Sequence, residues 1–242
     1  MTSRVFRARR TVKELLTMIY VTGDTHGDLS RFRGKEARRL KRNDTLLILG
    51  DFGFVWQGTP AERRTLKKLA KKRYRILFLD GSHENYDLLA EYPEVELDGG
   101  HAWQLGPRLF RLRRGEVYTV EGRTLLCLGG GESLDRESRE EGVTWWPAEL
   151  PDAADYARCD AALAAHGNTV DYILTHDGPA RLLHFLRLNR DTVLYEENAL
   201  ELYLNELMQR AKYQRWLFGR YHLDQPIGSS ACAVYKKLLP LE

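Results

Sequence analysis

The segment MIYVTGDTHGD, residues 18–28, decides how the rest of the chain is interpreted. It begins with an apolar run of strand length and ends in Asp24, His26 and Asp28, with glycines between them. Short, nearly continuous apolar runs are typical of strands covered on both faces. Glycine permits a tight turn directly after a strand. The segment therefore predicts a buried strand whose carboxyl end carries carboxylates and an imidazole.

The same arrangement recurs after four more apolar runs. Each run ends in Gly or Thr or is followed by Gly, and then come side chains that include metal-competent ones. The runs 45–49, 75–79, 171–175 and 215–218 lead respectively to Asp51, to Ser82 and His83, to His176 and Asp177, and to Arg220 and His222. In open α/β sheets the carboxyl ends of the strands converge on one crevice, where ligands bind. Aspartates and histidines gathered there form a cation site of mixed nitrogen and oxygen ligands, so the sequence predicts a metal site.

The segments between these runs indicate the fold class. Residues 31–42 and 60–73 have the character of helices, and 196–213 has the apolar spacing of an amphipathic helix. Residues 117–120 and 123–128 flank Glu121-Gly122, which is a hairpin signal. The order β-α-β-α-β along the first third predicts an α/β protein of layered architecture.

Length and composition limit the domain organisation and the location. The chain has 242 residues, so we expect a single domain over 18–242, preceded by a basic N-terminal extension over 1–17. That extension lacks the apolar region of a signal peptide, and no apolar run in the chain approaches the roughly 18 residues of a membrane span. The three scattered cysteines indicate reduced thiols. We expect a cytoplasmic protein with no membrane partner.

The net charge of +3 conceals an asymmetry. Residues 1–75 carry 20 basic and 7 acidic side chains, whereas the remainder carries 17 basic and 27 acidic. One interpretation is that the basic third attracts a phosphate-rich partner, such as the substrate or a nucleic acid. The other is that these side chains are the solvated faces of amphipathic helices.

The five strand-end motifs together resemble those of the calcineurin-like metallophosphoesterases, which run D-x-H, G-D, G-N-H-E, H and G-H-x-H in the same order. The resemblance extends from Met18 almost to the C-terminus. It implies a layered β-sandwich flanked by helices and a metal-dependent phosphoesterase, which hydrolyses a phosphomonoester or phosphodiester with water that the metal activates. The Asp51-Phe52-Gly53-Phe54 segment lacks the arginine of the protein Ser/Thr phosphatase branch, so protein phosphatase activity is not assigned.

The resemblance also implies roles for individual residues. Asp24, His26 and His222 would bind one divalent ion, Mn²⁺, Fe²⁺ or Zn²⁺, and Asp51 would bridge it to a second ion held by His176. His83 would lie beside the leaving group, where it either protonates that group or stabilises charge on the phosphoryl oxygens.

Two positions of the second metal site depart from the family pattern. Ser82 stands in place of an asparagine, and Arg220 stands in place of a histidine. Serine is a poor neutral ligand, and arginine is a permanent cation that does not coordinate metals.

Three alternatives follow, with one or two bound ions. Arg220 replaces the second ion and holds a phosphate oxygen, as a catalytic residue. Alternatively, the chain is a catalytically impaired phosphate-binding, nucleotide-binding or regulatory module on the same fold. In the third, waters and Asp177 complete the second site, and Arg220 turns outward.

The long charged segment after residue 128 adds two candidates for substrate binding. Long loops in compact domains are often functional, so Arg139 and Trp145 are expected to contact the substrate, a phosphoester small molecule or a nucleotide. The sequence specifies neither the substrate, nor the metal, nor the oligomeric state.

Overall fold

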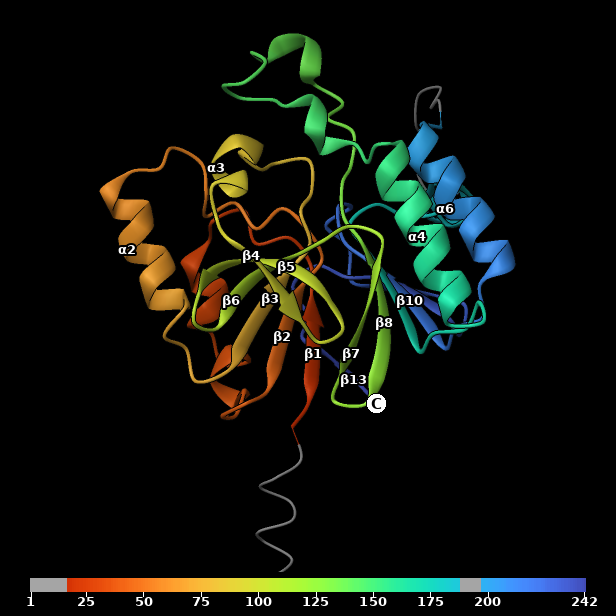
Figure 1. Cartoon of the computed structure of the whole chain (residues 1–242), viewed down its shortest axis with the longest axis horizontal. Helices are drawn as coiled ribbons and strands as arrows, with labels where there is room; N and C mark the ends of the chain where they lie inside the picture. Colours follow the sequence, from red (N-terminus) through yellow and green to blue (C-terminus); the bar gives the residue numbers. More distant parts are fainter. Residues whose placement is uncertain (1–16, 188–196) are drawn as a thin grey trace, which may run out of the picture.

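The computed structural model describes residues 17–187 and 197–242 (Figure 1). The basic extension expected over 1–17 lies outside this part of the chain, except for Thr17. A single domain over 18–242 stays a prediction.

The first of two sheets has seven strands. From one edge to the other they are β13 (Leu239–Leu241), β1 (Ile19–Thr22), β2 (Thr45–Ile48), β3 (Arg75–Phe78), β6 (Leu109–Leu112), β5 (Gly100–Gly106) and β4 (Glu94–Leu97). The central strands β1, β2, β3 and β6 are parallel, and the outer pairs are antiparallel. The first three apolar runs of the sequence are therefore neighbours, and their carboxyl ends lie at the same edge of the sheet.

The second sheet has six strands in the order β11 (Gln225–Ile227), β12 (Ala231–Ala233), β10 (Arg215–Phe218), β9 (Tyr172–Thr175), β8 (Arg123–Leu128) and β7 (Glu116–Val120). Strands β8, β9, β10 and β12 are parallel. The hairpin predicted at Glu121-Gly122 is confirmed, since it joins β7 to β8 with both residues at positive φ.

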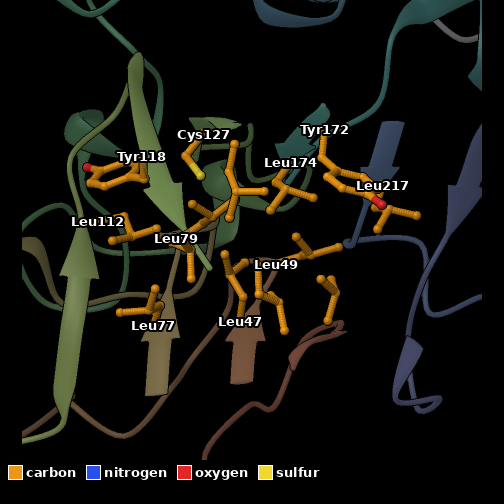
Figure 2. Close-up of a cluster of buried hydrophobic side chains, with 14 of the residues drawn as sticks. Leu47, Leu49, Leu77, Leu79, Leu112, Tyr118, Cys127, Tyr172, Leu174 and Leu217 are labelled. Carbon is orange, nitrogen blue, oxygen red and sulfur yellow. The ribbon is translucent and has the colours of Figure 1, made fainter. Parts of the chain in front are cut away.

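The two sheets pack face to face around one apolar cluster (Figure 2). Leu47, Leu49 and Leu77 enter it from the first sheet, and Leu174 and Leu217 enter it from the second. Helices cover the outer faces: α2 (Pro60–Leu69) and α3 (Tyr86–Ala90) on the first sheet, and α4 (Ala153–Ala165), α5 (Ala180–Arg187) and α6 (Ala199–Arg210) on the second (Figure 1). The predicted α/β sandwich flanked by helices is confirmed.

Two of the three predicted helices form. Thr59 caps α2 with its side chain and Pro60 occupies the first turn, whereas Asn198 and Glu201 form a capping box at the start of α6. The helix expected over 31–42 is wrong. Short 3₁₀ turns at Leu29–Phe32 and Ala37–Arg39 stand there instead, because the chain breaks at Gly34 between them and offers few inward apolar side chains.

None of the helices in the described ranges is long and apolar enough to cross a membrane. The three cysteines are buried and free of disulfides.

Candidate metal centre

Three side chains from the ends of two strands converge where the carboxyl ends of the parallel strands meet. This place is called the crevice below. Asp24 and His26 follow β1 in the first sheet, and His222 follows β10 in the second. The Nε2 atoms of the two imidazoles are 2.9 Å apart, and His222 Nε2 lies 3.2 Å from Asp24 Oδ2. The three side chains offer ligand atoms that all lie within 4.8 Å of one another. Asp24 is buried, whereas both histidines are partly open to solvent.

Asp51 connects this cluster to His176. Its Oδ2 atom lies 3.8 Å from His26 Nε2, and its Oδ1 atom lies 3.5 Å from His176 Nε2. His176 is fully buried at the end of β9, with its Nδ1 atom 2.8 Å from the carbonyl oxygen of Leu49. Its Nε2 atom is buried without a hydrogen-bond partner in the described chain. All five side chains assigned by resemblance to metal binding therefore lie together.

The backbone that holds these side chains is strained. His26, Asp51, Arg220 and His222 all have φ between 44° and 62°, in the left-handed region. Such conformations cost about 1–3 kcal/mol in non-glycine residues and concentrate at functional sites. Gly81 leaves space beside them, since a Cβ at that position would lie 2.2 Å from Asp51 Oδ1 and 2.8 Å from His176 Nε2.

The electrostatics of the cluster suit a cation. Burial raises the pKa of Asp51, but the imidazoles of His176, His26 and His83 lower it by more, so its carboxyl group ionises below its usual range. The hydrogen bond to Asp24 raises the pKa of His222. Burial lowers the pKa of His83, which favours its neutral form.

The donors around the first position fit a divalent metal ion. Asp24, Asp51, His26 and His222 supply carboxylate oxygens and imidazole nitrogens, the ligands that Mn²⁺, Fe²⁺ and Zn²⁺ accept. Each of their Nε2 and Oδ2 atoms lies within 4 Å of another in the cluster, so these atoms are directed at a common point.

Arg220 points into the molecule, toward the second metal position. Its side chain is 12% exposed, its Nε atom lies 3.4 Å from Asp177 Oδ2, and its Nη2 atom donates to the carbonyl oxygen of Glu132. A Cβ on Gly131 would lie 2.4 Å from Arg220 Nη1 and 2.9 Å from Cδ2 of His176, so the guanidinium and this imidazole border the same glycine. Burial lowers the pKa of Arg220, but Asp177, Tyr221 and Asp51 raise it above its ordinary value, so the group stays charged.

The second position does not fit a metal ion as well as the first. Asp51 and His176 remain, but Asp177 is engaged by Arg220 and by the hydroxyl of Tyr221. Arg220 therefore does not turn outward, contrary to the third alternative, in which waters and a nearby group such as Asp177 complete the site. Ser82 Oγ lies 3.4 Å from His83 Nδ1, beside the cluster.

His83 and Arg139 are in direct contact. The backbone N–H of His83 donates to Asp51 Oδ1 at 2.8 Å, which fixes the residue beside the cluster. Arg139 Nη2 lies 2.7 Å from His83 Nε2 and 2.8 Å from Asp135 Oδ2. A guanidinium has only donors, so His83 Nε2 accepts this hydrogen bond, and the proton of the neutral imidazole is on Nδ1.

Arg139 belongs to residues 129–150, here called the upper loop, which leaves the end of β8 and runs at the top of the view in Figure 1. Trp145, the other candidate from this loop, is partly exposed, and its Nε1 atom is buried without a hydrogen-bond partner in the described chain. Within the described residues, the loop thus brings Arg139 to His83, whereas Trp145 makes no hydrogen bond or ring contact with His83.

The family model of the calcineurin-like phosphoesterases matches residues 17–219. The chain belongs to this family. Among solved structures it is similar to the phosphopantetheinyl hydrolase PptH from Mycobacterium tuberculosis, with 13% sequence identity and a TM-score of 0.36 over 90% of this chain and 88% of that chain. A search of curated proteins found no match.

Three residues that contact the candidate site were not assigned a role from the sequence. Glu84 is buried and accepts the backbone N–H of Phe52 at 2.6 Å, which fixes the turn after Asp51. Arg31 donates to the carbonyl oxygen of Asp24 at 2.8 Å, and Tyr235 stacks on His222 with ring centroids 4.4 Å apart. Glu84 lies inside the third motif and carried a signal, whereas nothing in the sequence around Arg31 or Tyr235 relates them to the crevice.

Proposed function

We propose that the protein hydrolyses a phosphomonoester or phosphodiester with one divalent metal ion, and that Arg220 takes the place of the second ion. The observation that carries this proposal is the inward, buried guanidinium of Arg220 beside His176 and Gly131. Membership of the calcineurin-like family supports metal-dependent phosphoester hydrolysis as the general reaction.

Asp24, His26, Asp51 and His222 would hold the metal. When bound, a divalent ion at this position supplies Lewis-acid polarisation of the phosphoryl group and lowers the pKa of water. The low pKa of Asp51 keeps its carboxylate ionised for this role.

Arg220 would bind the phosphoryl group directly. Its Nε and Nη2 atoms are anchored by Asp177 and by the carbonyl of Glu132, whereas Nη1 donates no hydrogen bond within the described chain. A phosphoryl oxygen that accepts from Nη1 would meet a fixed positive charge at the place where the family pattern has a cation. Charge-assisted hydrogen bonds of this kind are roughly twice as strong as neutral ones.

His83 and Arg139 would act on the leaving-group side. His83 is held by Asp51 through its backbone, and Arg139 occupies its Nε2 atom. When the substrate enters, Arg139 would transfer its hydrogen bond to an oxygen of the substrate. Without that donor on Nε2, the imidazole would exchange its proton through solvent from Nδ1 to Nε2, and Nδ1 would then accept from the hydroxyl of Ser82, 3.4 Å away. The N–H of Nε2 would then donate to the leaving oxygen. His83 would assist departure of that oxygen either by protonating it or by stabilising its charge.

The incomplete second position favours one alternative function. A catalytically impaired module would bind a phosphorylated ligand or nucleotide through the same residues without turnover. The two functions are separated by measuring the metal content of the purified, metal-loaded chain together with hydrolysis of aryl phosphate monoesters and diesters.

For the proposed enzyme we expect about one ion per chain and turnover that Asp24→Asn and Asp51→Asn each reduce by at least about 100-fold. Bound metal and bound phosphate without turnover would establish the impaired module. A chain that binds no metal, and in which Asp51→Asn changes nothing, contradicts both.

A further inference from the structure

An open surface pocket of about 500 Å³, here called the cavity, lies between the upper loop and the segments that follow β2 and precede α3 in the first sheet. It is lined by Trp56, from the segment after β2, by Asn85, Asp87 and Leu88 at the start of α3, and by Val143 and Thr144 of the upper loop. Pockets for small organic ligands have volumes of about 300–1,000 Å³, so this one has room for a nucleoside.

The cavity adjoins the crevice through Arg139. One guanidinium nitrogen, Nη1, donates to the carbonyl oxygen of Thr144 at 3.3 Å, and Thr144 lines the cavity. The other, Nη2, contacts His83 Nε2. Asn85, two residues beyond His83, also lines the cavity. A ligand whose phosphate is in the crevice and whose leaving group points past His83 would therefore extend into this cavity.

One wall of the cavity is formed by Trp56, whose position is fixed by two neighbouring side chains. Asn85 Nδ2 donates to the carbonyl oxygen of Trp56 at 2.7 Å, and its Oδ1 atom accepts from the N–H of Leu88, so Asn85 positions Trp56. Trp146 supports Trp56 edge to face, with ring centroids 5.6 Å apart and planes at 82°. The two indoles are therefore not stacked on each other, and a planar group can stack on Trp56.

The polar groups of the cavity select for a donor and against an anion. Asp87 accepts the Trp146 indole N–H at 2.8 Å through Oδ2, and a carboxylate has further acceptor positions. None of the described residues lining the cavity is basic. A second phosphate or a carboxylate would therefore be repelled, whereas a neutral ring with an amino group would be accepted.

We propose that this cavity binds the base of a nucleoside phosphate, stacked on Trp56 with an amino group toward Asp87. The inference rests on the proposed phosphoesterase function and assigns the organic part of its substrate. Stacking of a base on an aromatic side chain contributes about 1–3 kcal/mol. A bound base should therefore raise kcat/KM by about 10-fold or more.

The test compares adenosine 5′-monophosphate with ribose 5-phosphate. Both carry the phosphate on the 5-hydroxyl of ribose, a primary alcohol, so a difference in kcat/KM reports the base. We expect the metal-loaded enzyme to favour the nucleotide by at least about 10-fold, Trp56→Ala to reduce this ratio to near 1, and Trp56→Phe to restore part of it. Leu134→Ala is the matched control, because Leu134 lies on the same loop, is 81% exposed and does not line the cavity.

Equal kcat/KM for the two substrates would overturn the inference and leave the proposed function intact. If neither is hydrolysed, calorimetric titration with adenosine and with ribose decides the matter. Binding of adenosine alone that is lost in Trp56→Ala supports the cavity as a base site independently of the proposed function, which the aryl phosphate monoester and diester assays decide. Absence of adenosine binding overturns the inference.

Discussion

Arg220 and Ser82 are the residues at which this chain departs from its family, and both lie beside the second metal position. With Arg220 replaced by histidine and Ser82 by asparagine, the position would regain two ligands and lose a permanent positive charge. We predict that the Ser82→Asn, Arg220→His double variant binds about two metal ions per chain where the wild type binds about one, as measured by elemental analysis after dialysis. Arg220→Gln is the control, since it removes the charge without adding a strong ligand and should lose activity while the metal content stays near one. An unchanged metal content in the double variant contradicts this account of the second position.

Tyr74 lowers the stability of the fold for a reason that the sequence does not indicate. It is 2% exposed, and its hydroxyl is buried without a hydrogen-bond partner in the described chain. Such a group costs about 1–3 kcal/mol, so Tyr74→Phe should raise the free energy of unfolding by about 1 kcal/mol at neutral pH.

The same substitution should alter the response to alkaline pH. Burial raises the pKa of Tyr74 from 10.0 to about 12. Above pH 10 the unfolded chain ionises this phenol while the folded chain does not, so the wild type loses up to about 1.4 kcal/mol per pH unit between pH 10 and 12. Below pH 10 this term is constant. Urea unfolding at pH 8, 10 and 11 should therefore show a gap between Tyr74→Phe and the wild type that widens only above pH 10; a gap independent of pH would refute the assignment.

At the level of single residues, the sequence was sufficient for side chains that follow strands. Each of five side chains lies within four residues of the end of an apolar run, and parallel strands bring such positions together: Asp24, Asp51, His83, His176 and His222. Their roles stay predictions until metal is measured. The direction of Arg220 could not be read from the sequence, because it depends on Asp177, Glu132 and Gly131, which arrive from two other segments.

Among the elements, the upper loop depends on one buried cation. Arg114 lies between β6 and β7, and its Nη2 atom lies 3.0 Å from Asp80 Oδ2 and donates to Tyr86 Oη and to the carbonyl oxygens of Ala148 and Glu149 at the loop's end. Tyr86 in turn donates to the carbonyl oxygen of Gly81, beside Asp51 and His176. The loop and the third motif are thus joined by one side chain.

We predict that Arg114→Met lowers the free energy of unfolding by about 3–5 kcal/mol, because the substitution leaves Asp80 buried without its counter-charge. Adding Asp80→Asn to the same chain removes that charge and should recover a part of the loss. Urea unfolding of the three chains measures both effects. Equal stability of wild type and Arg114→Met would show that the pair contributes nothing net.

Helices and strands could be predicted from the sequence where their apolar residues form a continuous run or a regular stripe. Strands with continuous apolar runs, and α6 with its stripe of Leu200, Leu204 and Leu207, form as expected. The helix expected over 31–42 does not, because basic composition alone does not produce a buried face. Arg114 and the cavity at Trp56 had no local pattern at all, since their partners are distant in the sequence.

At the scale of the whole molecule, the structure supports the second interpretation of the basic first third for α2, where Arg63, Arg64, Lys67 and Lys68 are exposed and Leu66 and Leu69 are buried. Arg38 and Arg73 from the same third form a separate group with Arg108, which lies later in the chain. Arg73 Nη2 donates to the carbonyl oxygen of Arg38, and Arg108 Nη1 donates to the carbonyl oxygen of Arg73. These arginines lie where β2, β3 and β6 begin, at the edge opposite the strand ends that carry Asp24, Asp51 and His83. The upper loop lies at the top of Figure 1 and the beginning of β1 at the bottom.

This separation predicts that the basic edge does not steer small substrates. A four-residue strand is about 13 Å long, which exceeds the Debye length of roughly 10 Å at 0.1 M salt. The Arg38→Glu, Arg73→Glu, Arg108→Glu variant should therefore keep kcat/KM for a small phosphoester within about twofold of wild type at 0.1–0.2 M salt. A nucleic-acid ligand would behave differently, because each lost phosphate contact lowers both its affinity and the salt dependence of that affinity. Titration of RNA and of DNA with the wild type and with this variant, across the same salt range, tests whether the basic edge binds a nucleic acid. A loss of more than about tenfold in small-substrate kcat/KM would mean that the basic edge acts on the crevice through the body of the sandwich.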